Sequence, residues 1–232
     1  MRANPPHVPQ HPVFTRRFGL PPRAAAAIKP GMHPRHQGQK SRPVPHEPAA
    51  RANRHVAQAE KAVPSLDEDA LMTIIANQAV PFVLILDCVQ DPHNLGAILR
   101  TADASGVHAV VAPKDKAVGI TETVRRVSVG AADHVPFAQV TNLARTMEKL
   151  KAAGLWLVGT SDHAGQSIYE TDLKGPLALV LGAEEKGMRR LTEENCDFLA
   201  SIPMAGKVEC LNVSVATGVC LFEAVRQRRA AP

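Results

Sequence analysis

Hydrophobic positions after residue 65 fall into short continuous runs that alternate with segments of helical periodicity. We expect five of these runs to be strands: Phe82–Leu86, Ala109–Ala112, Leu155–Gly159, Leu177–Leu181 and Leu199–Ile202. Because their apolar positions are continuous rather than alternating, the pattern indicates strands that are buried on both faces.

The segments between these runs have the spacing of helices. One helix begins at the acidic run Asp67–Asp69, which suits a helix N-terminus, and continues to about Ala76. Further helices are expected at Leu95–Ser105, Ile120–Val129, Asn142–Ala153, Arg190–Cys196 and Val213–Arg229. Strands that alternate with helices predict an α/β fold, a mainly parallel sheet with helices on both faces, formed by one domain over residues 65–232.

Residues 1–64 have a different composition. They hold 11 of the 27 Lys and Arg residues but only two acids, Glu47 and Glu60, together with 12 of the 19 prolines and six of the ten histidines. Such a segment has too little periodic apolar sequence to offset the entropy of ordering. We expect a disordered basic tail rich in Pro, His and Arg. It serves either as a solubilising extension or as a non-specific electrostatic arm for nucleic acid.

Several classes of protein are disfavoured by what the sequence lacks. It has no run of about 18 apolar residues that could span a membrane and no secretory signal. The four cysteines, Cys88, Cys196, Cys210 and Cys220, show no metal-binding spacing, so we expect reduced thiols in a cytoplasmic protein. The motifs GxGxxG, GxxxxGK(S/T), GxSxG and HExxH are absent. Their absence argues against hydride transfer, against phosphoryl transfer and against the hydrolases that carry a GxSxG or HExxH motif.

Three loops that follow predicted strands carry the candidate chemistry. In an open parallel sheet, ligands bind beyond the carboxyl ends of the strands. The loops within Asp91–Arg100, Leu181–Gly187 and Ile202–Ser214 lie there and are rich in Gly, Asn and acidic residues. Taken alone, each has an ordinary explanation, since Asn94, Asn212 or Ser214 could cap a helix and Gly182 could form a turn.

Taken together and in this order, the three loops resemble the signature motifs of the SpoU/TrmH family, the SPOUT-class RNA 2′-O-ribose methyltransferases that use S-adenosylmethionine. The motifs are Asn94–Ala102, Leu179–Gly187 and Ile202–Glu223, and the resemblance covers about residues 66–229. Segments at 91–96, 141–147, 187–192 and 220–228 are closer still to the branch that methylates a guanosine ribose in 23S rRNA. The alternatives are the same reaction on tRNA or on another rRNA nucleotide, or a non-catalytic ribosome-assembly protein that binds RNA.

The resemblance assigns catalytic roles to Arg100, Asn94, Glu184, Asn212 and Ser214. Arg100 would orient a phosphate or stabilise the developing alkoxide, because a guanidinium is a poor base at its high pKa. Asn94 would position the ribose or Arg100, and Glu184 would hold the loop backbone or a neighbouring Asn. Asn212 and Ser214 would orient the substrate, and the general base stays open.

The resemblance places the cofactor, S-adenosylmethionine, against the backbone of Gly182, Ile202 and Leu211, with Met204 packed nearby. No metal is implied, because the leaving group departs neutral. The family also implies a homodimer, with the last helix at its interface, and a C-terminal trefoil knot. General rules of chain topology would not have suggested the knot, since knots are essentially absent from proteins.

Three features depart from the family pattern. Cys210 stands where the family usually has Ser, and Glu185 stands where close relatives usually have Gly. A folded L30e-like RNA-binding domain usually precedes the catalytic domain, but residues 1–64 are too polar and too rich in Pro to form one. Because residues 65–232 carry a net charge of −4, we expect the basic tail, at +9, to attract the RNA instead.

Overall fold

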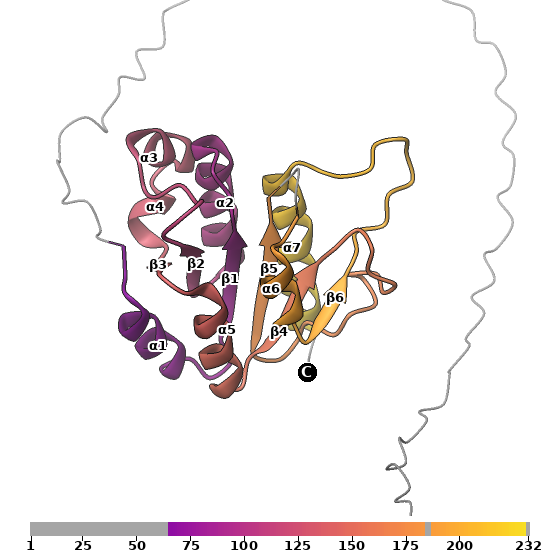
Figure 1. Cartoon of the computed structure of the whole chain (residues 1–232), viewed down its shortest axis with the longest axis horizontal. Helices are drawn as coiled ribbons and strands as arrows, with labels where there is room; N and C mark the ends of the chain where they lie inside the picture. The colour runs from indigo at the N-terminus through magenta and orange to yellow at the C-terminus, as the bar shows by residue number, and fades with distance from the viewer. Residues whose placement is uncertain (1–64, 184–186, 231–232) are drawn as a thin grey trace, which may run out of the picture. The chain divides into compact units, whose positions relative to one another are not determined.

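A six-stranded sheet forms the centre of the computed structural model, which describes residues 65–183 and 187–230. The strand order is β3-β2-β1-β5-β4-β6, and each pairing between these strands is parallel (Figure 1). The predicted α/β fold with a parallel sheet is therefore confirmed. Our expectations for residues 1–64, Glu184 and Glu185 lie outside the described residues.

The elements agree closely with the sequence pattern. The strands are β1 (Phe82–Asp87), β2 (Ala109–Pro113), β3 (Phe137–Val140), β4 (Trp156–Thr160), β5 (Leu177–Gly182) and β6 (Phe198–Ala200). The helices are α1 (Glu68–Ala76), α2 (Pro92–Ser105), α3 (Glu122–Ser128), α4 (Ala131–His134), α5 (Leu143–Ala152), α6 (Arg190–Glu194) and α7 (Val213–Ala230). All five predicted strands and six predicted helices are present, and their ends shift by a few residues.

Strand β3 and the short helix α4 were not predicted. Phe137–Val140 has only four residues, and the polar Gln139 interrupts its apolar run. The strand forms because β2 offers a paired edge, with Val110 opposite Phe137 in the register. On its other side the carbonyl of Phe137 accepts the backbone N–H of Leu66 at 2.8 Å, so the chain before α1 protects this edge.

The two faces of the sheet carry separate hydrophobic clusters. Leu84 and Leu86 of β1 face helices α2, α3, α4 and α7, whereas Val83 and Ile85 face α1 and α5. All six residues of β1 are buried. The structure thus confirms burial on both faces for β1, for β2 and for residues 177–181 of β5, whereas β6 is only partly buried and its Phe198 is 47% exposed. Full burial of each Leu or Ile contributes roughly 1.5–3 kcal/mol.

Helix α2 begins three residues earlier than expected. Asp91 is its N-cap and accepts the backbone N–H of His93 at 2.8 Å, and Pro92 occupies the first helical position. Our interpretation of Asn94 as a possible cap was therefore wrong, because Asn94 lies inside the first turn. The helix ends as predicted at Gly106, whose φ of 74° is the left-handed conformation that glycine adopts without strain.

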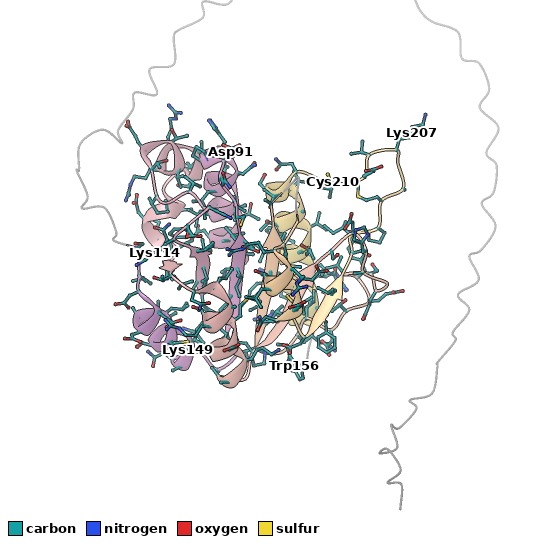
Figure 2. All side chains as sticks on the ribbon, viewed as in Figure 1. Asp91, Lys114, Lys149, Trp156, Lys207 and Cys210 are labelled. Atoms are coloured by element: carbon teal, nitrogen blue, oxygen red, sulfur yellow. The ribbon has the colours of Figure 1, made fainter. Side chains whose placement is uncertain are left out.

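Because all the strands are parallel, the carboxyl ends of all six lie along the same end of the sheet. Figure 2 shows Asp91 and Cys210 at this end of the molecule and Trp156, the first residue of β4, at the other. None of the helices within residues 65–183 and 187–230 is long and apolar enough to cross a membrane.

Candidate active site

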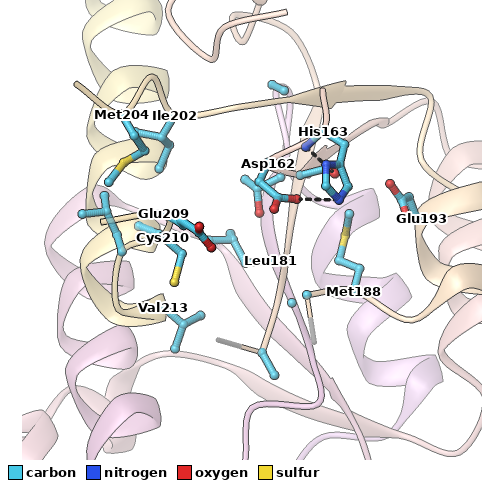
Figure 3. A pocket seen from close by; sticks show the side chains of 18 residues that line it. Asp162, His163, Leu181, Met188, Glu193, Ile202, Met204, Glu209, Cys210 and Val213 are labelled. Carbon is cyan, nitrogen blue, oxygen red and sulfur yellow. Dashed lines mark hydrogen bonds and ion pairs between the residues drawn. The ribbon is translucent and has the colours of Figure 1, made fainter. Parts of the chain in front are cut away.

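A pocket of about 360 Å³ opens at the carboxyl ends of β4, β5 and β6. All four residues that the resemblance assigned to the cofactor line it: Gly182, Ile202, Met204 and Leu211 (Figure 3). Gly182 ends β5, and the other three belong to the segment between β6 and α7. Residues from two distant motifs thus meet in one cavity, at the edge where parallel sheets bind ligands.

Apolar and charged side chains both line the pocket. Figure 3 shows Met204 and Ile202 on one side, and His163 and Glu193 on the other. Asp162 and Glu209 also line it, and Asp162 Oδ1 lies 3.5 Å from His163 Nε2. No Lys or Arg lines the pocket among the described residues. The cavity therefore combines an apolar wall with three carboxylates, a surface suited to a ligand with an apolar body and positive charge.

Gly182 is required by the close approach of two backbone segments. A Cβ atom added at this position would lie 2.1 Å from the carbonyl carbon of Gly187 and 2.2 Å from the nitrogen of Met188. The approach is fixed by Ala183, which exchanges two backbone hydrogen bonds of 2.8 and 3.1 Å with Gly187. The glycine thus allows the turn after β5 to fold back on itself and form one wall of the pocket.

Asn94 and Asn212 meet beside this pocket. Asn212 Nδ2 donates to Asn94 Oδ1 at 3.0 Å, and Asn212 Oδ1 accepts the Ser214 backbone N–H at 2.9 Å. Ser214 Oγ also lies 2.5 Å from Asn212 Oδ1. Asn212 therefore caps α7 and joins it to α2, while its neighbours Leu211 and Val213 line the pocket. The structure brings three of the five predicted catalytic residues together in this way.

Arg100 lies on the same helix as Asn94, about one and a half turns further on. Its side chain is exposed, is not part of the pocket lining and makes no hydrogen bond or ion pair with the described residues. The guanidinium is therefore available to a ligand from outside the chain. The fifth predicted residue, Glu184, lies outside the described residues.

Some pocket residues were not predicted. Asp162 and His163 follow β4, and Glu193 belongs to α6, so none of them falls within the three motifs. Ligands of parallel sheets bind beyond the carboxyl ends of the strands, and this rule applies equally to β4. It would have indicated Asp162 and His163. Cys210, noted as a departure from the family pattern, does line the pocket, and so does Glu209.

The comparison of sequences agrees with this geometry. The profile of the SpoU rRNA Methylase family matches residues 81–222. A 23S rRNA (guanosine-2'-O-)-methyltransferase RlmB of Ralstonia nicotianae is 60% identical over 177 residues, which are 76% of this chain and 70% of that protein. The RlmB protein of Escherichia coli is 59% identical over 69% of this chain and 66% of its own length. For the RlmB protein of Pseudomonas aeruginosa, the match covers 61% of its length.

Solved structures are similar as well. The SpoU methyltransferase AviRb from Streptomyces viridochromogenes, in complex with AdoMet, has a TM-score of 0.62 and 32% identity, over 67% of this chain and 64% of that one. The A. aeolicus TrmH/SpoU tRNA modifying enzyme has a TM-score of 0.60 and 31% identity, over 70% of this chain and 82% of that one. With its motifs gathered at one edge of the sheet and a family match over most of residues 65–230, the chain belongs to the SpoU rRNA methylase family.

Proposed function

We propose that the protein transfers a methyl group from S-adenosylmethionine to a ribose 2′-hydroxyl in RNA, with a guanosine of 23S rRNA as the substrate. One observation carries this proposal: the four cofactor-motif residues line one pocket, and Asn94, Asn212 and Ser214 form a hydrogen-bonded cluster beside it. The substrate is inferred from the RlmB relatives, whose names specify guanosine and 23S rRNA.

The pocket fits S-adenosylmethionine in size and charge. Its volume of about 360 Å³ lies within the usual range for small-molecule sites, roughly 300–1,000 Å³. The apolar wall of Ile202, Met204 and Leu211 suits an adenosine, and the turn at Gly182 offers backbone groups. S-adenosylmethionine supplies a methyl group on a positively charged sulfur, and the carboxylates of Asp162, Glu193 and Glu209 favour a positive ligand.

The chain's residues must orient the ribose and accommodate the negative charge that develops on its 2′ oxygen. S-adenosylmethionine would supply the methyl group when bound: the 2′ oxygen would bond to the methyl carbon, the electron pair of the broken carbon–sulfur bond would go to sulfur, and the 2′ proton would pass to water. Asn94 and Asn212 hold the ribose in line beside the pocket. Arg100 stabilises the developing alkoxide or an adjacent phosphate, because its guanidinium stays protonated.

Methyl transfer from tritiated S-adenosylmethionine to purified RNA tests the proposal. We expect label on 23S rRNA, with no label on tRNA, and mapping should locate it on one guanosine 2′-oxygen. Label on tRNA alone would favour the reaction implied by the name of the A. aeolicus neighbour. A protein that shows no thermal shift with S-adenosylmethionine would instead be a non-catalytic RNA-binding member of the family.

We also propose the trefoil knot, which the strand order supports. Although β4 and β5 are adjacent in the sheet, the segment that connects them does not run directly from one strand to the other. Ser167 in this segment forms a parallel bridge with Ser201, just after β6, and β6 itself pairs with β4. The segment that connects β4 to β5 therefore passes along the outer side of β6. The C-terminal part of the chain, which begins with β6, then runs between β4 and this connecting segment.

A homodimer and a cytoplasmic location complete the proposal. Helix α7 presents two apolar residues to solvent, Val215 at 52% exposure and Phe222 at 49%. They are seven residues apart and so lie on one face of the helix. An apolar stripe of this kind suits a subunit interface, and sedimentation of the purified protein should give twice the monomer mass. The cytoplasmic location follows from a ribosomal substrate.

A further inference from the structure

We infer that Asp87 and Arg189 form a positioning pair that holds one wall of the cofactor pocket, an inference that rests on the proposed function. Asp87 ends β1 and its side chain is fully buried, while the Arg189 side chain is 39% exposed. Asp87 Oδ2 accepts the Arg189 backbone N–H at 2.8 Å, and Oδ1 lies 2.8 Å from both Nε and Nη2 of Arg189.

The pair acts on residues that line the pocket. Gly187 and Met188 form part of its lining, and Arg189 follows them directly. On the other side, Gly187 is bonded to Ala183 by the two backbone hydrogen bonds already described. The two lining residues are thus held between β5, through Ala183, and β1, through Asp87.

The register of the sheet makes this arrangement specific to the cofactor site. Asp87 is the direct partner of Gly182 in the pairing of β1 with β5, so the carboxylate lies next to the turn whose tight geometry Gly182 permits. Both guanidinium nitrogens approach one carboxylate oxygen while the other oxygen accepts the backbone N–H, so the charge-assisted contacts fix orientation as well as distance. A pair that only stabilised the fold would not need to join the residue that follows the pocket wall.

A third group binds the same carboxylate oxygen. The Cys88 thiol lies 3.4 Å from Asp87 Oδ1, and burial, followed by the charge of Asp87, raises the pKa of Cys88. The thiol therefore stays protonated at neutral pH and can donate to the carboxylate. Asp87 is therefore contacted by both Cys88 and Arg189, and these contacts suit a residue that positions Arg189.

Asp197 provides a matched control at the opposite end of the sheet. Its Oδ2 accepts the Leu157 backbone N–H at 2.9 Å, and its Oδ1 pairs with Lys151 at 2.7 Å. Like Asp87 it combines a backbone contact with an ion pair, but neither Asp197 nor its partners line the pocket. It therefore separates loss of stability from loss of positioning.

The experiment measures the S-adenosylmethionine Kd by calorimetry, kcat at saturating cofactor, and Tm for each variant of the full chain. We expect Asp87→Asn and Arg189→Gln to raise the Kd about tenfold or more while kcat changes by less than about threefold. Arg189→Lys should give an intermediate Kd, because it keeps the charge but not the planar fork. Asp197→Asn should lower Tm and leave the Kd unchanged.

A wild-type Kd in Arg189→Gln would overturn the inference, as would a Kd raised equally by Asp197→Asn. If Asp87→Asn does not fold, Arg189→Gln decides the question, because its side chain is partly exposed and its removal leaves the backbone contact intact. The wild type is titrated first. If it does not bind S-adenosylmethionine, the proposed function fails, whereas normal binding by wild type and variants alike removes only the positioning role.

Discussion

The side-chain amide of Asn212 donates a 3.0 Å hydrogen bond to Oδ1 of Asn94, across 118 positions of the sequence. The contact joins the first turn of α2 to the residue that caps α7, and these two helices pack together against the same face of the sheet. Because Asn212 also accepts the Ser214 backbone N–H, one side chain both caps α7 and orients Asn94. The proposed ribose site and the fold thus depend on the same amide.

Asn212→Ala should reduce methyl transfer by about tenfold or more, the factor that corresponds to 1.4 kcal/mol. It should also lower the free energy of unfolding by about 1 kcal/mol, the usual cost of losing an N-cap. Asn142→Ala is the control, since Asn142 caps α5 through the Arg145 N–H at 3.1 Å and lies outside the pocket lining. It should lose similar stability and keep full activity. Equal activity in both variants would contradict the role of Asn212.

Arg100→Ala should abolish methyl transfer while the S-adenosylmethionine Kd stays within about twofold of wild type, which is under 0.5 kcal/mol. The reason is that Arg100 is exposed and lies outside the pocket lining. Arg126→Ala, which removes an exposed arginine from α3, serves as the control. Loss of cofactor binding in Arg100→Ala would refute the role assigned to this residue.

Gly182→Val should abolish binding of S-adenosylmethionine and lower stability by about 3 kcal/mol or more, because overpacking is costly and here the obstacle is backbone. The added Cβ would lie 2.1 Å from the Gly187 carbonyl carbon, so the turn must open. Gly165→Ala is a suitable control, since a Cβ there meets nothing within 4 Å. Normal cofactor affinity in Gly182→Val would mean that the cofactor binds elsewhere.

Most of the fold followed from the sequence because the central strands β1, β2 and β5 are buried on both faces and therefore appear as continuous apolar runs. The exceptions have clear causes. Strand β3 is short and contains Gln139, so its pairing with β2 rather than its own sequence makes it a strand. The start of α2 was predicted at Leu95, three residues too late, because the helix begins at Pro92 and proline suits the first position of a helix.

The site could be predicted only where motif residues contribute to it. Gly182, Ile202, Met204 and Leu211 were all placed by the resemblance, and the structure brings them into one pocket. The Asp87–Arg189 pair was not foreseen, because its members are 102 positions apart and neither belongs to the three signature motifs, although Arg189 lies in the segment 187–192. Contacts of this kind depend on the register of β1 against β5, which the hydrophobic pattern alone does not specify.

His108 should make stability depend on pH. Its Nδ1 accepts the Phe82 backbone N–H at 2.8 Å, and burial, followed by the positive charge of Arg228, lowers the pKa of His108. The unfolded chain therefore binds a proton more readily than the folded one. The stability from this contact is present above the unfolded pKa of about 6.5 and is lost as the pH falls below it.

Chemical denaturation between pH 7.5 and 5 measures this effect. The slope of the unfolding free energy against pH should become smaller in His108→Gln, because that side chain does not titrate. His163→Gln is the control for the replacement of an exposed histidine, since the His163 side chain is 90% exposed. A slope that is the same in His108→Gln as in wild type would show that His108 does not contribute.

The final prediction concerns the basic tail, residues 1–64, which carries 11 Lys and Arg residues and two acids. Deletion of residues 1–60 should raise the Kd for RNA and flatten its dependence on salt, because each phosphate contact that is lost also removes the release of a counterion. Replacing the Lys and Arg residues of the tail by Gln, at unchanged length, should have the same effect if charge is the cause. The S-adenosylmethionine Kd should stay constant in both variants, since the pocket is formed by residues from 160 to 216. Unchanged RNA affinity and salt slope would leave the tail as a solubilising extension and assign RNA recognition to the catalytic domain.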